Sequence, residues 1–178
     1  MTVKRTDPSR RRPANVILIG MPGSGKSTIG VLLAKRLAWR FVDTDVVLQA
    51  GAGAPLKTIQ ARRGMAAFRR MEADSLRRLR GRRQVIATGG SAVYYPAALA
   101  HLRRLGRVVF LDVPLAELRR RLTDFDDRGI VRRPGQTLAS LWRERRPLYR
   151  READLTVRWD GTSHEKWAER IIEAIGML

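Results

Sequence analysis

The chain has 178 residues, of which 44% are hydrophobic and 30% charged, and it contains no cysteine, so it is long enough for one domain with a buried core and excludes disulfides and thiolate metal sites. Its apolar runs are too short for a membrane-spanning helix. The formal charge of +19 is spread along the chain without a nucleic-acid-binding signature, so we expect a cytoplasmic protein with no specific nucleic-acid or membrane partner.

The chain begins with a basic, polar segment, residues 1–13, which lacks the apolar run of a secretory signal and which we expect to be a disordered tail. Residues 14–178 are predicted to form a single domain in which strands alternate with helices. The predicted strands are residues 16–19, 41–42, 85–87, 108–111 and 155–157. This alternation is typical of an α/β fold with a mostly parallel sheet that helices cover on both faces.

The first predicted strand leads into the sequence Gly-Met-Pro-Gly-Ser-Gly-Lys-Ser at residues 20–27, and a helical pattern follows it. This is the phosphate-binding motif G-x-x-x-x-G-K-S in its required setting of strand, loop and helix. Backbone N–H groups would bind phosphate oxygens, Lys26 would neutralise the β- and γ-phosphates, and Ser27 would offer a hydroxyl to Mg²⁺. The ATP-binding residues predicted here are Gly23, Ser24, Gly25, Lys26, Ser27 and Thr28.

Two acidic residues, Asp43 and Asp45, follow the second predicted strand. Because alternate residues of a strand face the same side, both carboxylates can point toward the phosphate loop. Phosphoryl transfer needs an anchor for Mg²⁺ and a group that orients the acceptor hydroxyl and takes its proton, and two acids can supply both. A helix N-cap formed by Asp45 is the structural alternative.

Gly89 and Gly90 follow the third predicted strand. Two glycines there permit a close approach of the backbone to a substrate, although a plain tight turn would use them equally well. Two further stretches lack strong strand character. Residues 46–79 show mainly helical patterns, and residues 123–137 hold acidic residues, glycine and proline among arginines. We interpret the second stretch as a mobile lid, with a solvated charged loop as the alternative.

These segments together resemble the shikimate kinases, from residue 15 to about residue 175. The matching segments are Gly-Met-Pro-Gly-Ser-Gly-Lys-Ser at 20–27, Phe-Val-Asp-Thr-Asp at 41–45, Ala-Phe-Arg-Arg-Met-Glu at 67–72, Thr-Gly-Gly at 88–90 and Glu-Arg-Arg-Pro-Leu-Tyr at 144–149. The resemblance implies a three-layer P-loop kinase fold, like that of nucleoside monophosphate kinases, with a five-stranded parallel sheet. It also implies a substrate-binding helical region at about 46–79 and a lid at about 123–137.

The resemblance further implies roles for the acidic residues and for two arginines. Asp43, with Ser27, would hold Mg²⁺, and Asp45 would bind the substrate hydroxyls and act as the base. Arg69 and Arg145 would bind the substrate carboxylate, which suits the planar, two-pronged guanidinium group.

Other roles implied by the resemblance fall on glycines and lid arginines. The backbone of Gly89 and Gly90 would pack against the substrate ring. Arg128 would reach the transferred phosphate, with Arg132 and Arg133 as further lid candidates. Arg120 would lie near the nucleotide base, with its neighbour Arg121 as the alternative.

Two departures from the family pattern lie near the expected acceptor site. Ser91 replaces the usual third glycine, and Gly129 replaces the usual proline after the lid arginine. We predict a monomeric, ATP- and Mg²⁺-dependent kinase that phosphorylates a small hydroxy acid, shikimate at its 3-hydroxyl, in aromatic amino-acid biosynthesis. A same-fold kinase for a different hydroxylated metabolite is the nearest alternative. A regulatory protein that uses ATP as a switch is the alternative from another class.

Overall fold

The computed structural model describes residues 13–123, 125 and 129–177. Its centre is a five-stranded sheet in which every neighbouring pair is parallel, in the order β2-β3-β1-β4-β5. The strands are β1 (Asn15–Ile19), β2 (Arg40–Asp43), β3 (Gln84–Ala87), β4 (Arg107–Asp112) and β5 (Leu155–Arg158). Each predicted strand lies within one of these, so the predicted α/β class and the parallel sheet are confirmed.

The middle of the sheet is formed by β3, β1 and β4, and every residue of these three strands is buried. Helices cover both faces, so these strands read as continuous apolar runs rather than as alternating patterns. The outer strands β2 and β5 are partly exposed and less apolar. This difference explains why sequence patterns predicted β2 as the shortest strand.

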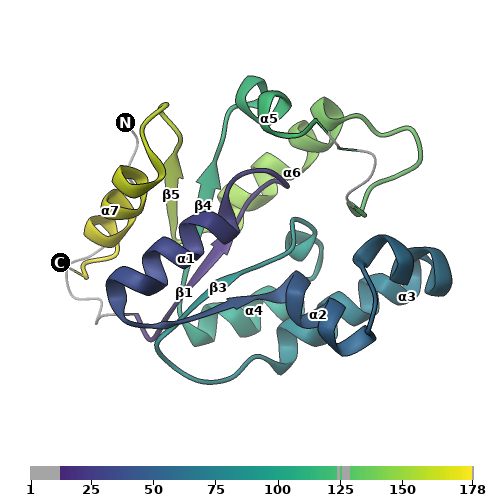
Figure 1. Cartoon of the computed structure of the whole chain (residues 1–178), viewed down its shortest axis with the longest axis horizontal. Coiled ribbons are helices and arrows are strands. Elements are labelled where there is room, and N and C mark those ends of the chain that lie inside the picture. The colour runs from purple at the N-terminus through teal and green to yellow at the C-terminus, as the bar shows by residue number, and fades with distance from the viewer. Residues whose placement is uncertain (1–12, 124, 126–128, 178) are drawn as a thin grey trace.

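Helices flank the sheet in two layers. They are α1 (Lys26–Leu37), α4 (Pro96–Leu105), α5 (Leu115–Arg121), α6 (Leu138–Glu152) and α7 (His164–Ala174). Helices α1 and α7 pack together over one face, and α4 and α6 cover the other (Figure 1). The main core lies between these layers and includes Trp167, Tyr149 and Phe110, which are at most 1% exposed.

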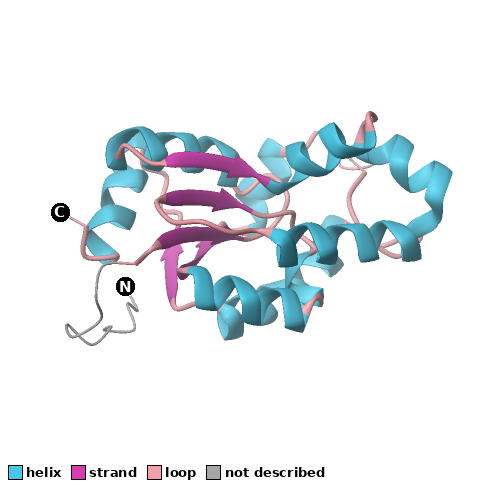
Figure 2. Ribbon diagram, turned by 90° about the horizontal axis from the view of Figure 1, so that it is seen from below, coloured by secondary structure: helices cyan, strands magenta, loops and turns pink. Residues whose placement is uncertain are grey.

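A second helical region extends past the carboxyl ends of the strands, the end toward which the front strands point in Figure 2. It contains α2 (Thr44–Ala52) and α3 (Leu56–Arg78), and α3 bends at Gly64, where φ is 75°. A short 3₁₀ helix, η1 (Ala92–Tyr94), follows β3. A small apolar cluster of Leu48, Ile59, Phe68 and Val131 forms the separate core of this region. The region 46–79 is therefore mainly helical, as predicted.

Two expectations concern parts of the chain that are only partly described. The predicted tail lies outside the described residues except for Pro13. The predicted lid is described at residues 123, 125 and 129–137, and Arg128 lies outside that description. Across the described part of the chain, no helix combines the length and the apolar character needed to cross a membrane.

Candidate active site

The phosphate loop connects β1 to α1 at the carboxyl edge of the sheet. Gly25 is the N-cap of α1 and has a φ of 89°, a left-handed conformation that glycine adopts without steric cost. Lys26 is buried, and its Nζ donates hydrogen bonds to the carbonyl oxygens of Gly20 at 3.0 Å and Met21 at 2.9 Å. Burial lowers the pKa of Lys26 to about 8, although Asp45 and Asp43 oppose the shift. An anion bound next to Lys26 would stabilise its charged form, which burial disfavours.

Five of the six residues predicted to bind ATP in this loop line one cavity. They are Gly23, Gly25, Lys26, Ser27 and Thr28. Ser24 is fully buried instead, and its backbone N–H donates to Met21 O at 3.1 Å. This hydrogen bond closes a turn within the phosphate loop.

Asp43 joins the phosphate loop to α2. Its Oδ2 accepts a hydrogen bond from Ser27 Oγ at 2.6 Å, and its Oδ1 accepts from the backbone N–H groups of Asp45 at 3.0 Å and Val46 at 3.4 Å. Asp43 is thus the N-cap of α2, and the alternative that gave this role to Asp45 was wrong. A hydroxyl and a carboxylate in contact are oxygen ligands of the kind that Mg²⁺ prefers.

The donor set around Ser27 and Asp43 is small. Among the described residues, no group of three or more histidine, aspartate or glutamate side chains is arranged to hold a metal ion. Mg²⁺ commonly keeps several waters and takes only one or two carboxylates together with substrate phosphates. The pair therefore fits an ion that arrives with a nucleotide rather than one held by the protein alone.

Asp45 lies in the first turn of α2, and not at the end of a strand as the alternation argument assumed. Its side chain nevertheless faces the glycines after β3, because a Cβ on Gly89 would lie 2.7 Å from Asp45 Oδ1. Burial raises the pKa of Asp45, and the positive charge of Lys26 opposes this shift. The N-cap formed by Asp43 thus starts α2 so that Asp45 faces the same cavity as Lys26.

The two glycines after β3 are required by close contacts. A Cβ on Gly90 would lie 2.9 Å from Pro22 Cδ and 3.1 Å from Arg145 Nη1, and neither glycine has a positive φ. Gly89 also donates its N–H to Thr44 Oγ1 at 3.1 Å. The backbone N–H of Ala92 donates to Gly89 O at 3.2 Å, so the glycines lie in a tight turn and also allow a close approach of Pro22, Arg145 and Asp45.

Ser91 directs its hydroxyl into the protein. Ser91 Oγ donates to Glu72 Oε1 at 2.5 Å, and Tyr95 donates its hydroxyl to Glu72 Oε2 at 2.5 Å. Burial raises the pKa of Glu72 to about 7, and these two hydrogen bonds oppose the shift. The extra hydroxyl at position 91 is thus used by Glu72.

Sequence reasoning assigned no role to Glu72, which lines the cavity beside Asp45. A signal for it exists in the helical spacing of α3. Glu72 stands four residues after Phe68 and four before Leu76, in a row of otherwise apolar buried residues. An acidic residue on the buried face of a helix indicates a partner or a ligand.

Arg145 and Arg69 are the two arginines predicted to bind a carboxylate, and the structure places them differently. Arg145 is 0% exposed, lines the cavity and donates from Nε to Tyr94 Oη at 3.1 Å and from Nη2 to Val131 O. Arg69 is exposed on α3 and does not line the cavity in this conformation. Its guanidinium carbon lies 6.0 Å from the centre of the Tyr94 ring, and Tyr94 does not line the cavity either.

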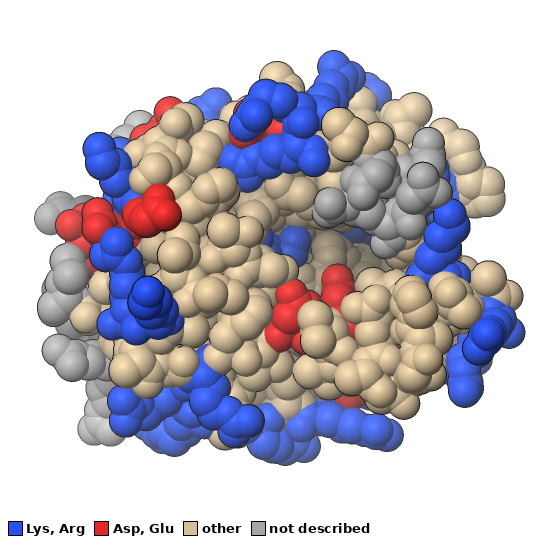
Figure 3. Space-filling model, viewed as in Figure 1, with Lys and Arg blue, Asp and Glu red and all other residues tan. Residues whose placement is uncertain are grey.

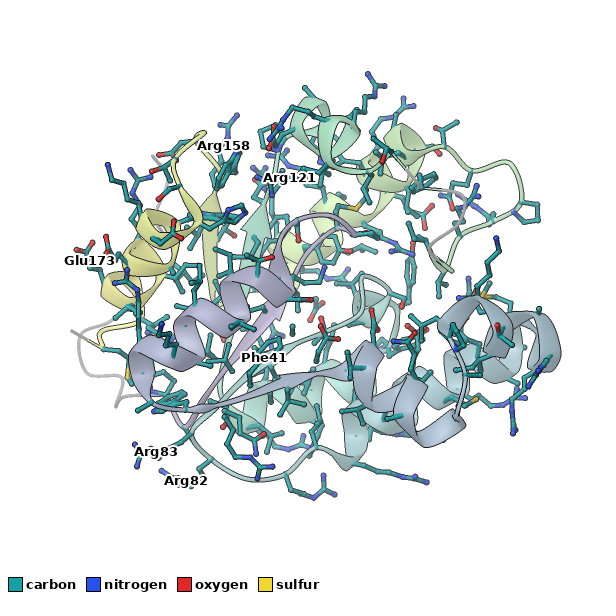
Figure 4. The ribbon with its side chains drawn as sticks, in the orientation of Figure 1. Phe41, Arg82, Arg83, Arg121, Arg158 and Glu173 are labelled. Atoms are coloured by element: carbon teal, nitrogen blue, oxygen red, sulfur yellow. The ribbon has the colours of Figure 1, made fainter. Side chains whose placement is uncertain are left out.

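Arg120 and Arg121 both line the cavity, and both pair with Glu117. The Arg120 side chain is 73% exposed, whereas that of Arg121 is 14% exposed. Arg121 points toward the phosphate loop, with Nη1 3.5 Å from Ser24 O (Figure 4). The Arg121 guanidinium also lies 4.5 Å from the centre of the Trp159 ring. The geometry therefore favours Arg121 over Arg120 as the arginine beside a bound nucleotide.

Three described residues of the segment predicted as a lid line the cavity, namely Gly129, Ile130 and Val131. Gly129 has a φ of 61°, and a Cβ there would lie 2.9 Å from the backbone N of Lys57 at the start of α3. Gln60 donates its Nε2 to Gly129 O. Proline fixes φ near −65° and cannot adopt this conformation, which gives a physical reason for glycine at this departure from the family pattern.

The phosphate loop, the start of α2, the glycines after β3 and Arg145 line one cavity of about 710 Å³. This volume is within the range of small-molecule sites. Figure 3 shows the molecular surface hollowed near its middle, with acidic atoms at the edge of the hollow and basic atoms deeper inside. The acidic residues that line the cavity are Asp43, Asp45 and Glu72, and the buried basic ones are Lys26 and Arg145. The cavity therefore offers cations for phosphate and carboxylate groups and carboxylates for hydroxyl groups.

Comparison with known proteins identifies what this arrangement resembles. Residues 22–176 match the family model described as "Shikimate kinase". A shikimate kinase of Moorella thermoacetica is 41% identical over 166 residues, which cover 92% of this chain and 95% of that protein. One from Synechococcus sp. (strain RCC307) is 41% identical over 183 residues, covering 97% of this chain and 93% of that protein.

Solved structures agree with these sequence matches. A shikimate kinase from Acinetobacter baumannii, solved in complex with shikimate, superposes with a TM-score of 0.84 at 31% identity, covering 91% of this chain and 92% of that one. A gluconokinase from Sinorhizobium meliloti gives a TM-score of 0.51 at 19% identity, covering 93% of each chain. The second likeness is one of fold alone.

Proposed function

The chain belongs to the shikimate kinase family and is an ATP-dependent phosphotransferase of the shikimate pathway, and we propose how its cavity moves the γ-phosphoryl group of ATP onto the 3-hydroxyl of shikimate. The observation that carries this proposal is the convergence of Lys26, Asp45 and Arg145 on one cavity. Their charges perturb one another, since Asp45 raises and Arg145 lowers the pKa of Lys26. Perturbed titratable groups in a cleft are typical of active sites.

The nucleotide half of the site comprises the phosphate loop and Arg121. Backbone N–H groups at the start of α1 and the ammonium group of Lys26 bind the β- and γ-phosphates. The guanidinium of Arg121 lies 4.5 Å from the centre of the Trp159 ring, and this arginine would lie beside the nucleotide base. Ser27 and Asp43 would hold Mg²⁺, which would supply positive charge that neutralises the phosphate groups.

The acceptor half comprises Asp45, the two glycines and the arginines. Asp45 accepts a hydrogen bond from the acceptor hydroxyl, orients it and takes its proton as the bond from the acceptor oxygen to the γ-phosphorus forms. The bond from that phosphorus to the bridging oxygen breaks, and ADP leaves with the electron pair. Arg145 binds the carboxylate of shikimate, and Arg69 assists it.

The remaining parts of the proposal concern closure and assembly. Residues 123–137 act as a lid that excludes water, an otherwise competing acceptor, and Arg128 supplies charge to the transferred phosphate. Gly129, Ile130 and Val131 already line the cavity, which supports this role for the segment. We further propose that the enzyme works as a monomer in the cytoplasm.

The test measures ADP release by the purified protein with ATP, Mg²⁺ and shikimate, against no acceptor and a panel of other hydroxy acids. We expect shikimate-dependent turnover. Asp45→Asn should lower kcat by about 10²-fold or more and leave ATP affinity nearly unchanged, because the carboxylate acts at the acceptor. Lys26→Ala serves as a comparison that should lose turnover through the nucleotide half of the site.

Two results would contradict this proposal. Turnover with another hydroxy acid but not with shikimate would move the acceptor assignment to the alternative metabolite kinase. An unchanged kcat in Asp45→Asn would remove Asp45 from the chemical step.

A further inference from the structure

Tyr94, the last residue of η1, contacts both arginines that the proposed function assigns to the acceptor carboxylate. The guanidinium carbon of Arg145 lies 4.9 Å from the centre of the Tyr94 ring, and that of Arg69 lies 6.0 Å from it. Both distances fall within the range of cation–π contacts. The two arginines come from α6 and α3, which are separate in sequence, and this ring is a contact that they share.

The hydroxyl of Tyr94 is committed on both sides. It accepts a hydrogen bond from Arg145 Nε at 3.1 Å and donates one to Glu144 Oε1. Burial and the contact with Glu144 raise the pKa of Tyr94, so the phenol keeps its proton and remains a donor. A tyrosine hydroxyl has one proton to donate, and this one is aimed at Glu144.

Glu144 links Tyr94 to the C-terminal part of the proposed lid, residues 123–137. Its Oε2 accepts from Arg133 Nη2 at 2.7 Å and from Gln136 Nε2 at 2.7 Å. Arg145 in turn donates from Nη2 to the carbonyl oxygen of Val131. Residues 131–136 are therefore tied to Arg145 twice, once directly and once through Glu144 and Tyr94.

Arg145 needs such support because of where it lies. It is fully buried, and among the residues that the structure describes it forms no ion pair with a carboxylate. A buried guanidinium is costly to keep without partners, and a long side chain loses rotamer freedom when it is held in one geometry. The ring and hydroxyl of Tyr94 give the Arg145 guanidinium a polar partner and hold its side chain in one geometry. Neither contact neutralises the positive charge, so the charge can still bind a ligand.

We propose that Tyr94 is a positioning residue that orients Arg145 and Arg69 for the acceptor carboxylate. Glu144 connects this tyrosine to residues 131–136, the C-terminal part of the proposed lid. This inference rests on the proposed function, because it takes the carboxylate as the group that the arginines bind. Tyr94 itself touches the arginines rather than the reacting atoms. Its effect should therefore appear in acceptor binding rather than in the chemical step.

The test compares shikimate with its methyl ester, which lacks the negative charge, as acceptors for the wild type and for Tyr94→Phe. The variant keeps the ring and loses both hydrogen bonds. We expect its KM for shikimate to rise about 10-fold, the loss of one hydrogen bond to a charged group, with kcat and the KM for ATP changed less than about twofold. The preference for shikimate over the ester, as a ratio of kcat/KM values, should fall by the same factor.

A matched control removes a hydrogen bond from another ring that lies beside an arginine of α6. The Trp142 ring lies 4.8 Å from the Arg146 guanidinium, donates from Nε1 to Val113 O at 3.2 Å and does not line the cavity. Trp142→Phe should leave the preference for shikimate over the ester unchanged. Glu144→Ala should lower the preference, and Glu144→Gln, which retains an oxygen that can accept from Tyr94, should restore part of it.

The outcomes separate this inference from the proposed function. A strong preference in the wild type that Tyr94→Phe leaves unchanged would overturn the role of Tyr94 alone. No preference in the wild type would overturn the carboxylate-binding role of the arginines, and this inference with it, while shikimate-dependent turnover would stand. If Tyr94→Phe does not fold, the Glu144 pair decides by the same ratio, since equal ratios in Glu144→Ala and the wild type would overturn the link.

Discussion

At the scale of single residues, the acceptor end of the site is defined by carboxylates held in a buried setting. Glu72 accepts hydrogen bonds from Ser91 and Tyr95, yet burial still raises its pKa to about 7. Asp45, across Gly89, contributes to that shift through its own negative charge, and Arg145 opposes it. Two carboxylates facing one small space suit a ligand that brings several hydroxyl groups.

The raised pKa of Glu72 predicts a pH-dependent cost in stability. A carboxyl group with a pKa near 7 when folded and 4.5 when unfolded binds more protons in the folded state between these values, so its contribution to stability falls as pH rises through this window. Glu72→Gln should therefore stabilise the protein, by about 2 kcal/mol more at pH 8 than at pH 5.5. Urea unfolding at both pH values measures this, and an equal effect at both would contradict it.

At the scale of elements, Asp43 both caps a helix and contacts the phosphate loop. Asp43 caps α2 through Oδ1 and contacts Ser27 through Oδ2. The cap fixes the direction of α2, and that direction aims Asp45 at Gly89. The position of the proposed base is thus a consequence of how the helix starts.

The two functions of Asp43 can be separated by substitution. Asp43→Asn keeps an oxygen that can cap α2 but removes the charge, so stability should change little while activity at limiting Mg²⁺ falls at least about 10-fold. Asp43→Ala removes the cap as well and should cost about 1 kcal/mol of unfolding free energy. Thr137→Ala, which removes the cap of α6, is the matched control and should lose stability without a changed Mg²⁺ requirement.

Full activity of Asp43→Asn at limiting Mg²⁺ would leave Asp43 with the capping role alone. Thermal or urea unfolding and a titration of activity against Mg²⁺ supply the two readouts.

At the scale of the whole molecule, the charge of +19 is distributed over many elements. Figure 3 shows lysine and arginine in separate groups around the visible face. Several arginines pair within the fold, for example Arg146 and Arg150 with the buried Asp112. On the visible face the basic groups are thus separate, and some of them are neutralised by ion pairs within the fold.

The excess positive charge predicts salt-sensitive, sequence-independent adhesion to polyanions. The protein should bind heparin or unrelated DNA at about 50 mM salt and lose most of that affinity by about 200 mM. Electrophoretic shift with DNA of several sequences, together with activity at both salt concentrations, tests this. A sequence preference, or binding that survives high salt, would instead indicate a specific nucleic-acid site.

Much of the fold was predictable because its determinants are local. Apolar runs predicted all five strands, and strand–helix alternation predicted the parallel sheet, since parallel strands require crossover connections. The phosphate loop was predictable for the same reason, because its residues are consecutive and their roles follow from backbone geometry. The edge strand β2 was underestimated because a partly exposed strand has a weaker apolar pattern.

What the sequence determined by itself was therefore the chemistry of the chain: a phosphate loop, two nearby acids, and the residues that resemble a kinase family. Only the tertiary structure decided which of these residues lie together and which contacts each of them makes. Arg120 and Arg121 are adjacent and both pair with Glu117, but Arg121 also contacts Ser24 O and the Trp159 ring, which the sequence does not reveal. The contacts of Glu72 with Ser91 and of Tyr94 with Glu144 span 19 and 50 residues, and such contacts exist only once the sheet has brought α3, η1 and α6 together.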